Sequence, residues 1–177
     1  MNQRTKLKSI TYIALGAVIL AICSWISIPT PFVPFTLQTL GVYFLVCFFG
    51  ARRAFWSIVV YIALGLIGVP VFSSFGSGAG VLLGVTGGFI FGFLPSVALC
   101  MALESIFAKK RIYRVAVSFV SLIACYAAGA LWAARFTEIG FLKTFYTCFI
   151  SFSLFDVIKI FFAVMLSDYM KRLKISV

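Results

Sequence analysis

Two ionisable residues, Asp156 and Lys159, lie in the middle of a long apolar stretch near the C-terminal end of the chain. A spacing of three residues places both side chains on one face of a helix. Such charges are costly in an apolar setting and usually face a protein interior or a water-filled cavity, where they serve a function. The pair therefore indicates a binding site for a small polar molecule. A purely structural ion pair that orients the helix is the alternative.

A second group of polar residues follows the apolar, proline-rich segment 28–35. Its three prolines predict a stiff, non-helical connection, which suits either a lid over an apolar ligand or a tight corner between two helices. Thr36, Gln38 and Thr39 come next. Gln38 can both donate and accept hydrogen bonds, so it can recognise an amide-like ligand. It can equally cap a helix or bond a neighbouring one.

Glycine recurs every fourth residue at Gly80, Gly84, Gly88 and Gly92, with Thr86 and Gly87 between them. This spacing predicts a glycine stripe that allows close helix packing and is compatible with a closely approaching ligand. The preceding glycine-rich loop does not indicate a nucleotide site, because no Lys-Ser/Thr pair and no strand–helix context follow it.

Several chemistries are excluded by residue type. The chain has no histidine, so histidine-based catalysis and histidine-bound metals are ruled out. The five cysteines are scattered singly through apolar runs, which predicts packing and not metal binding. No nucleophile–base arrangement surrounds Asp156 and Lys159. We therefore expect no catalytic residues, no metal and no cofactor, and the chain is not expected to be an enzyme.

The composition then defines the elements that carry these residues. Of the 177 residues, 63% are hydrophobic and 11% are charged, whereas soluble domains are about half apolar and about a quarter charged. The runs are continuously apolar, which favours helices and predicts an all-α integral membrane protein. We expect one transmembrane domain, 1–177, in which the first span is retained and not cleaved as a signal. The six expected spans are 9–28, 35–50, 54–72, 80–107, 114–134 and 144–169.

The basic residues predict the orientation of these spans. Most of the 15 Lys and Arg residues lie before the first span, between the second and third, between the fourth and fifth, and after the sixth. The opposite connections hold only Arg135 and Lys143. By the positive-inside rule, both termini are expected in the cytoplasm. Because the charges lie in short clusters between apolar runs, the net charge of +11 does not indicate nucleic-acid binding.

A stripe of small residues, Ala14, Ala17 and Ala21, follows one face of the first span. Small residues allow close helix contact in membranes. They can pack inside this chain or offer a flat surface to another membrane protein, and the sequence alone does not favour either.

The sequence resembles the BioY family, the biotin-binding S components of energy-coupling factor (ECF) transporters. The matching stretches, in order, are VPFTLQTL at 33–40, GARR at 50–53, YIALGLIGVPVF at 61–72, GVTGGFIFGF at 84–93, and Asp156-x-x-Lys159.

The resemblance implies a six-helix S component in the cell membrane that captures biotin from outside. It implies partners as well: a transmembrane coupling subunit, to which the alanine stripe would dock, and two ATPases. The chain has no Walker motif, so ATP energy would come from those partners. The ligand-binding residues carried over from the family are Asp156, Lys159, Gln38, Thr39, Ser77, Thr86, Gly87 and Gly88.

The chemistry of biotin fits these residues. Asp156 can accept from the ureido N–H groups, and Lys159 can donate to the ureido carbonyl or neutralise the carboxylate. Apolar walls are expected from Phe32, Phe35, Phe72 and Tyr43. Two other functions stay open: transport of another vitamin, or of biotin without ATP, by the same architecture, and a membrane-embedded enzyme or assembly protein.

Overall fold

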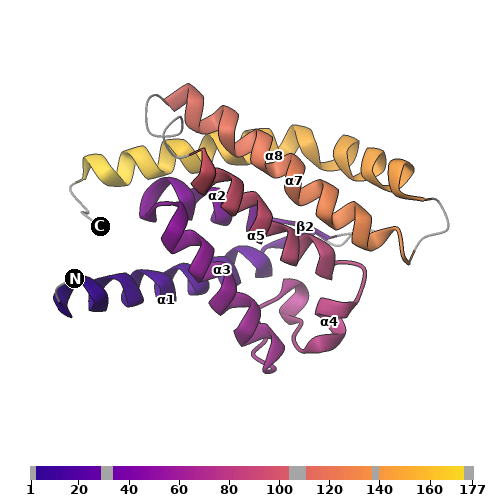
Figure 1. The fold of residues 1–177 in the computed structure, drawn as a ribbon, viewed down its shortest axis with the longest axis horizontal. Coiled ribbons are helices and arrows are strands. Elements are labelled where there is room, and N and C mark those ends of the chain that lie inside the picture. The colour runs from indigo at the N-terminus through magenta and orange to yellow at the C-terminus, as the bar shows by residue number, and fades with distance from the viewer. Residues whose placement is uncertain (1–2, 29–33, 104–110, 137–139, 174–177) are drawn as a thin grey trace.

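The computed structural model describes residues 3–28, 34–103, 111–136 and 140–173, and these form a helical bundle with one small hairpin (Figure 1). The strands β1 (Ser27–Ile28) and β2 (Phe35–Thr36) pair in antiparallel fashion. The helices are α1 (Gln3–Trp25), α2 (Gln38–Phe49), α3 (Ala51–Leu66), the 3-10 turn η1 (Ser73–Phe75), α4 (Ala79–Leu83), α5 (Gly87–Ala102), α7 (Arg111–Ala133) and α8 (Phe141–Arg172).

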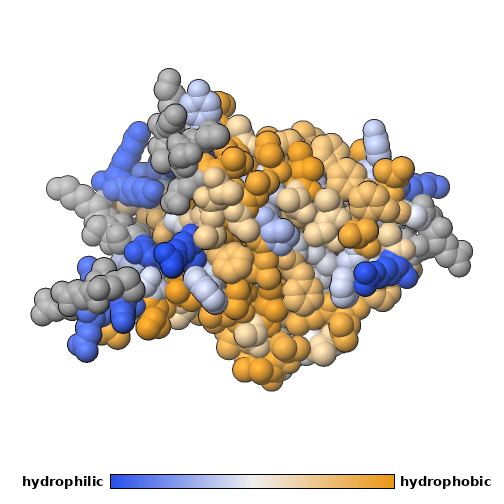
Figure 2. Space-filling view, viewed as in Figure 1, coloured by the Kyte–Doolittle hydropathy of each residue, from blue (hydrophilic) through white to orange (hydrophobic). Residues whose placement is uncertain are grey.

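The apolar character of the sequence is visible on the surface. In Figure 2 the middle of the visible face is mostly apolar, and hydrophilic residues gather toward its two ends. By length and composition, two of the described helices are suited to crossing a membrane, within Lys6–Trp25 and Arg111–Ala133. The helices Gln38–Phe49 and Gly87–Ala102 are apolar but shorter.

The helix expected over 80–107 is not continuous, which corrects the expectation drawn from its apolar run. The chain leaves the helix after Leu83 and re-enters it at Gly87. Gly84 has extended backbone angles, and a Cβ atom on Gly87 would lie only 1.7 Å from the carbonyl oxygen of Leu82. The glycines that suggested a packing stripe therefore also make a tight turn. The expected end at 107 lies outside the described residues.

Two other boundaries differ because of local backbone chemistry. The second helix begins at Gln38 and not at 35, since Phe35 and Thr36 belong to β2. The third ends at Leu66 and not at 72, because Gly68 takes a positive φ of 101° and Pro70 follows it.

The connections alternate between two ends of the bundle (Figure 1). The start of α1, the α2–α3 junction, the start of α7 and the end of α8 lie at one end. The described basic residues Arg52, Arg53, Arg111, Arg114, Lys171 and Arg172 belong to these segments. The opposite side of the bundle carries α4, the end of α7 and the start of α8, with Arg135 and Lys143 in or next to these helix ends.

The alanine stripe of α1 faces mainly inward, so packing inside this chain, one of the two possibilities left open by the sequence, applies to two of its three residues. Ala17 and Ala21 are 2% and 5% exposed and belong to the hydrophobic core. They lie on the face by which α1 packs against α2 and α3. Of the three alanines, only Ala14 is exposed.

The glycine stripe brings α5 close to α7, as the spacing predicts. A Cβ atom on Gly92 would lie 2.9 Å from the carbonyl oxygen of Cys125, and one on Gly88 would lie 2.2 Å from the Cβ of Trp132. Gly80, in α4, has open space around it. The stripe is therefore a packing surface in α5 and not in α4.

We predict that Gly92→Ala destabilises the protein by about 1–3 kcal/mol, because the new methyl group forces two helix backbones apart. Gly80→Ala is the matched control and should be neutral or slightly stabilising, since its methyl group meets no atom. Thermal unfolding in detergent, followed by tryptophan fluorescence, measures both. Equal midpoints for the two variants would contradict the close α5–α7 contact.

Candidate functional site

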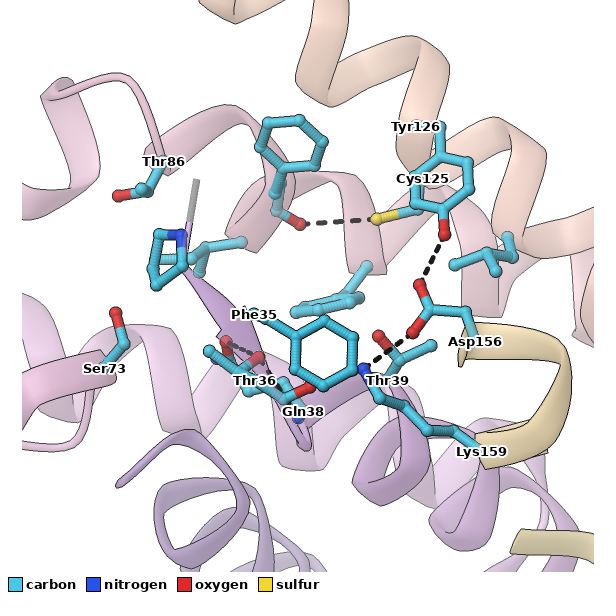
Figure 3. Close-up of a pocket in the computed structure, with 15 residues that line it drawn as sticks. Phe35, Thr36, Gln38, Thr39, Ser73, Thr86, Cys125, Tyr126, Asp156 and Lys159 are labelled. Carbon is cyan, nitrogen blue, oxygen red and sulfur yellow. Dashed lines mark hydrogen bonds and ion pairs between the residues drawn. The ribbon is translucent and has the colours of Figure 1, made fainter. Parts of the chain in front are cut away.

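A pocket opens beside the hairpin, among β2, α2, α5, α7 and α8, and Asp156 and Lys159 lie in its lining (Figure 3). It contains about 620 Å³ of atom-free space, including the open space at its mouth. We call it the binding pocket. Its lining residues are Pro34, Phe35, Thr36, Gln38, Thr39, Ser73, Thr86, Phe89, Ile90, Phe93, Leu122, Cys125, Tyr126, Asp156 and Lys159.

The centre of the pocket is the ion pair predicted from the sequence. The Nζ atom of Lys159 lies 2.8 Å from Oδ1 of Asp156, and both side chains project from the same face of α8. Asp156 is 4% exposed and Lys159 is 7% exposed. Two opposite charges this deeply buried stabilise each other only when their remaining hydrogen-bonding capacity is also satisfied.

Neighbouring elements supply those additional partners. Tyr126 of α7 donates its hydroxyl proton to Oδ2 of Asp156. Lys159 donates a second hydrogen bond to the carbonyl oxygen of Thr36 in β2, at 2.7 Å. Its ammonium group also lies 3.6 Å from the centre of the Phe35 ring, a cation–π contact. The pair thus links α8 to α7 and to the hairpin.

The pair still has capacity for a ligand. An ionised carboxylate accepts about four hydrogen bonds, and Asp156 uses one on each oxygen within the described residues. An ammonium group has three N–H donors, and two of those of Lys159 are used. An acceptor and a donor 2.8 Å apart can bind a group that carries an N–H next to a C=O.

Gln38 lines the pocket and bonds a neighbouring helix, as one of the alternatives drawn from the sequence predicts. Its amide nitrogen donates to the hydroxyl of Tyr61 in α3, at 2.7 Å. Its amide oxygen accepts from the hydroxyl of Thr36, at 2.9 Å. These two bonds fix which way the amide faces, so the polar edge of the pocket is held in place.

The structure brings together some of the remaining predicted residues and not others. Thr39 and Thr86 line the pocket, as does the expected apolar wall Phe35. Ser77, Gly87, Gly88, Tyr43 and Phe72 are not in the lining. Phe32 lies outside the described residues.

Three of the residues that do not line the pocket, Tyr43, Gly88 and Phe72, contact the helices that form its walls or their neighbours. The Tyr43 hydroxyl is hydrogen-bonded to Ser96 at 2.7 Å, which joins α2 to α5. Gly88 contacts Trp132, and Phe72 packs against Tyr61. Their positions matter to the pocket's shape because they fix the helices that form its walls.

The α7 wall formed by Leu122, Cys125 and Tyr126 was not predicted from the sequence. One signal was available for Tyr126, since a buried phenol usually finds a hydrogen-bond partner. The sequence alone could not show that this partner is Asp156, which lies 30 residues away. The α5 wall, formed by Phe89, Ile90 and Phe93, was also missed as lining because aromatic residues are common throughout the chain.

The other described acidic residue belongs to a different site. Asp168 accepts from Arg111 at 2.8 Å and forms an ion pair with Arg114 at 2.7 Å. Within the described residues, no cluster of metal-binding side chains is found.

Comparisons with known proteins give a consistent family. The model of the BioY family matches residues 1–175. The biotin transporter BioY2 of Lactococcus lactis subsp. cremoris is 39% identical over 89% of this chain and 86% of its own length. The biotin transporter BioY of Thermotoga maritima is 32% identical over 89% of this chain and 92% of its own length.

A solved structure shares the fold. A crystal structure of the S-component for biotin from an ECF-type ABC transporter superimposes with a TM-score of 0.84 at 23% identity. The match covers 97% of this chain and 95% of that one.

The buried ion pair makes a prediction that does not depend on the ligand. Lys159→Met should destabilise the protein by about 3–5 kcal/mol, because it leaves the Asp156 carboxylate buried without its cation. The double variant Asp156→Leu/Lys159→Met removes both charges and should recover most of that loss. Thermal unfolding in detergent measures both variants. A double variant no more stable than Lys159→Met would show that the two charges are not coupled.

Proposed function

The chain belongs to the BioY family, and on that premise we propose that it is the membrane subunit that captures biotin for uptake. Two relatives, from Lactococcus lactis and Thermotoga maritima, are named biotin transporters. Each matches this chain over most of its own length. The observation that carries the proposal is the buried pair Asp156–Lys159 in the wall of an otherwise largely apolar pocket.

The proposed topology is a single transmembrane domain, 1–177, that crosses the cell membrane six times with both termini in the cytoplasm. The concentration of basic residues at the end where α1 begins and α8 ends supports it. In this topology α4 and α5 together make the fourth crossing. The binding pocket then lies toward the outer face, where it can receive biotin from outside.

The ureido ring of biotin carries N–H donors next to a carbonyl acceptor. We assign the N–H groups to Asp156, which has free acceptor capacity, and the carbonyl to the remaining N–H donor of Lys159. The 2.8 Å separation of the two charged groups supports this assignment, since both then meet one edge of one small ring. In the alternative, Lys159 neutralises the carboxylate of biotin, which lies at the far end of the valeryl chain from the ureido ring.

The rest of the molecule is proposed to contact the pocket's other residues. Phe35, Phe89 and Phe93 offer apolar walls for the thiophane ring and the valeryl chain. Gln38, Thr39 and Thr86 offer polar contacts. Ser77, Gly87, Gly88 and Tyr43 stay in the proposal as residues that shape the pocket without lining it.

The proposal predicts that purified protein binds biotin in preference to riboflavin and thiamine. Asp156→Asn should weaken biotin binding about tenfold to a hundredfold, because a buried charge-assisted hydrogen bond contributes about 1.5–3 kcal/mol. Equilibrium binding of radiolabelled vitamins in detergent measures this, and Asp168→Asn is the matched control outside the pocket. Tighter binding of riboflavin or thiamine would assign the fold to another vitamin.

Biotin methyl ester, which lacks the charged carboxylate, distinguishes the two roles of Lys159. If Lys159 meets the ureido carbonyl, Lys159→Met weakens biotin and its methyl ester by the same factor. A loss confined to biotin would instead place Lys159 on the carboxylate.

Biotin uptake in this proposal needs a partner that supplies energy. We propose a transmembrane coupling subunit with two ATPases, as the family resemblance implies; the structural relative is itself the S-component of an ECF-type ABC transporter. Because Ala17 and Ala21 are buried, docking would use the outward face of α1, where Ala14 lies between exposed Ile10 and Val18. Uptake without ATP is the alternative, and the docking variants distinguish it.

We expect Ala14→Trp to leave biotin binding intact and to abolish ATP-driven uptake, because the bulky ring would separate α1 from its partner. Ala17→Trp is the contrasting variant and should lower stability by about 1–3 kcal/mol or more, since its ring has no space in the core. Biotin binding, thermal unfolding and uptake into cells with the coupling module measure these effects. Unchanged uptake by Ala14→Trp would exclude this face as the docking surface.

A further inference from the structure

A second hollow lies at the end of the bundle that carries the start of α1 and the end of α8, where α1 meets the α2–α3 junction. We call it the basic groove. Arg52 and Arg53 lie at one side of it, and Ile13, Phe49 and Trp56 supply an apolar wall. None of these residues takes part in the binding pocket, so the groove is a separate site.

The arginines of the groove carry positive charge that no described carboxylate neutralises. Arg52 is exposed, and Arg53 is half-buried with its guanidinium 5.2 Å from the centre of the Tyr12 ring. The two acidic residues in the described part of the chain are committed elsewhere, Asp156 to Lys159 and Asp168 to Arg111 and Arg114. The groove therefore has a local positive potential that attracts anions.

The backbone at the start of α3 adds to this potential. Gly50 takes a φ of 89°, which makes a sharp turn, and α3 begins at Ala51 with no acidic residue in its first turn. The first N–H groups of a helix lack intrahelical partners and carry a partial positive charge. Two arginines at the N-terminus of α3 are repelled by the partial positive charge of its first N–H groups. An anion in the groove would reduce this repulsion.

The apolar wall indicates what kind of anion fits. Trp56 is 50% exposed, and Ile13 and the largely buried Phe49 also line the groove. A free phosphate or an acidic peptide gains little from such a wall. A phospholipid gains from both parts, because its headgroup meets the arginines while its acyl chain lies along the aromatic and aliphatic side chains.

We propose that the basic groove binds an anionic phospholipid of the cytoplasmic leaflet. The phosphate lies between Arg52, Arg53 and the first N–H groups of α3, and an acyl chain lies against Ile13 and Trp56. The cytoplasmic position rests on the orientation proposed above. The site itself needs only that this end of the bundle meet a leaflet with anionic lipids.

The test compares the association of spin-labelled phosphatidylglycerol and phosphatidylcholine with full-length protein in phosphatidylcholine bilayers. Wild-type protein should select phosphatidylglycerol. Arg52→Gln should reduce that selectivity about fivefold and Arg52→Gln/Arg53→Gln about thirtyfold, as expected for one and two basic residues near an anionic lipid surface. Arg52 makes no hydrogen bond or ion pair within the described residues, so its substitution should leave the fold unchanged.

Arg135→Gln is the matched control, since Arg135 stands over the Trp132 ring at 5.2 Å, as Arg53 stands over Tyr12. It should keep the selectivity of wild-type protein. Equal selectivity in wild type and the double variant would overturn the proposal. Equal lipid selectivity together with a loss of ATP-driven uptake in the double variant would also overturn it. That combination would assign the groove to a protein partner. Biotin binding is measured on the same samples, so a failure of the proposed function is seen independently of lipid selectivity.

Discussion

The structure depends on the requirement that charges buried in an apolar body be paired. Asp156 and Lys159 satisfy each other, and Tyr126 and the carbonyl oxygen of Thr36 satisfy much of what remains. These contacts connect α8 with α7 and with the hairpin, which are distant in sequence. The same pair that gives the binding pocket its polar chemistry therefore fixes the relative position of three of its walls.

Local spacing was enough to predict the acid–base pair, because three residues along a helix determine that two side chains share a face. Spacing was not enough for Tyr126, whose partner comes from another helix and is decided by packing. The alanine stripe shows the same limit: small residues mark a close contact, yet only the tertiary structure tells that Ala17 and Ala21 face inward. The break at 84–86 was missed because glycine serves both helix packing and tight turns, and hydrophobicity does not separate the two.

The two ends of the bundle differ in how they treat charge. At the hairpin end, the described acid and base are enclosed and matched, so the binding pocket carries little net charge. At the other end, arginines and lysines are numerous and partly exposed, and only Asp168 opposes them among the described acidic residues. This division follows from physical cost, since an unpaired cation is inexpensive at a membrane surface and expensive inside.

The hydrogen bond from Lys159 to the backbone of Thr36 has a consequence for what a bound molecule must contribute. Because the ammonium group is already held by a carboxylate, a carbonyl and an aromatic ring, it needs no cargo to compensate its burial. A molecule that binds beside it therefore does not have to supply a counter-charge. A captured molecule completes this arrangement and does not create it.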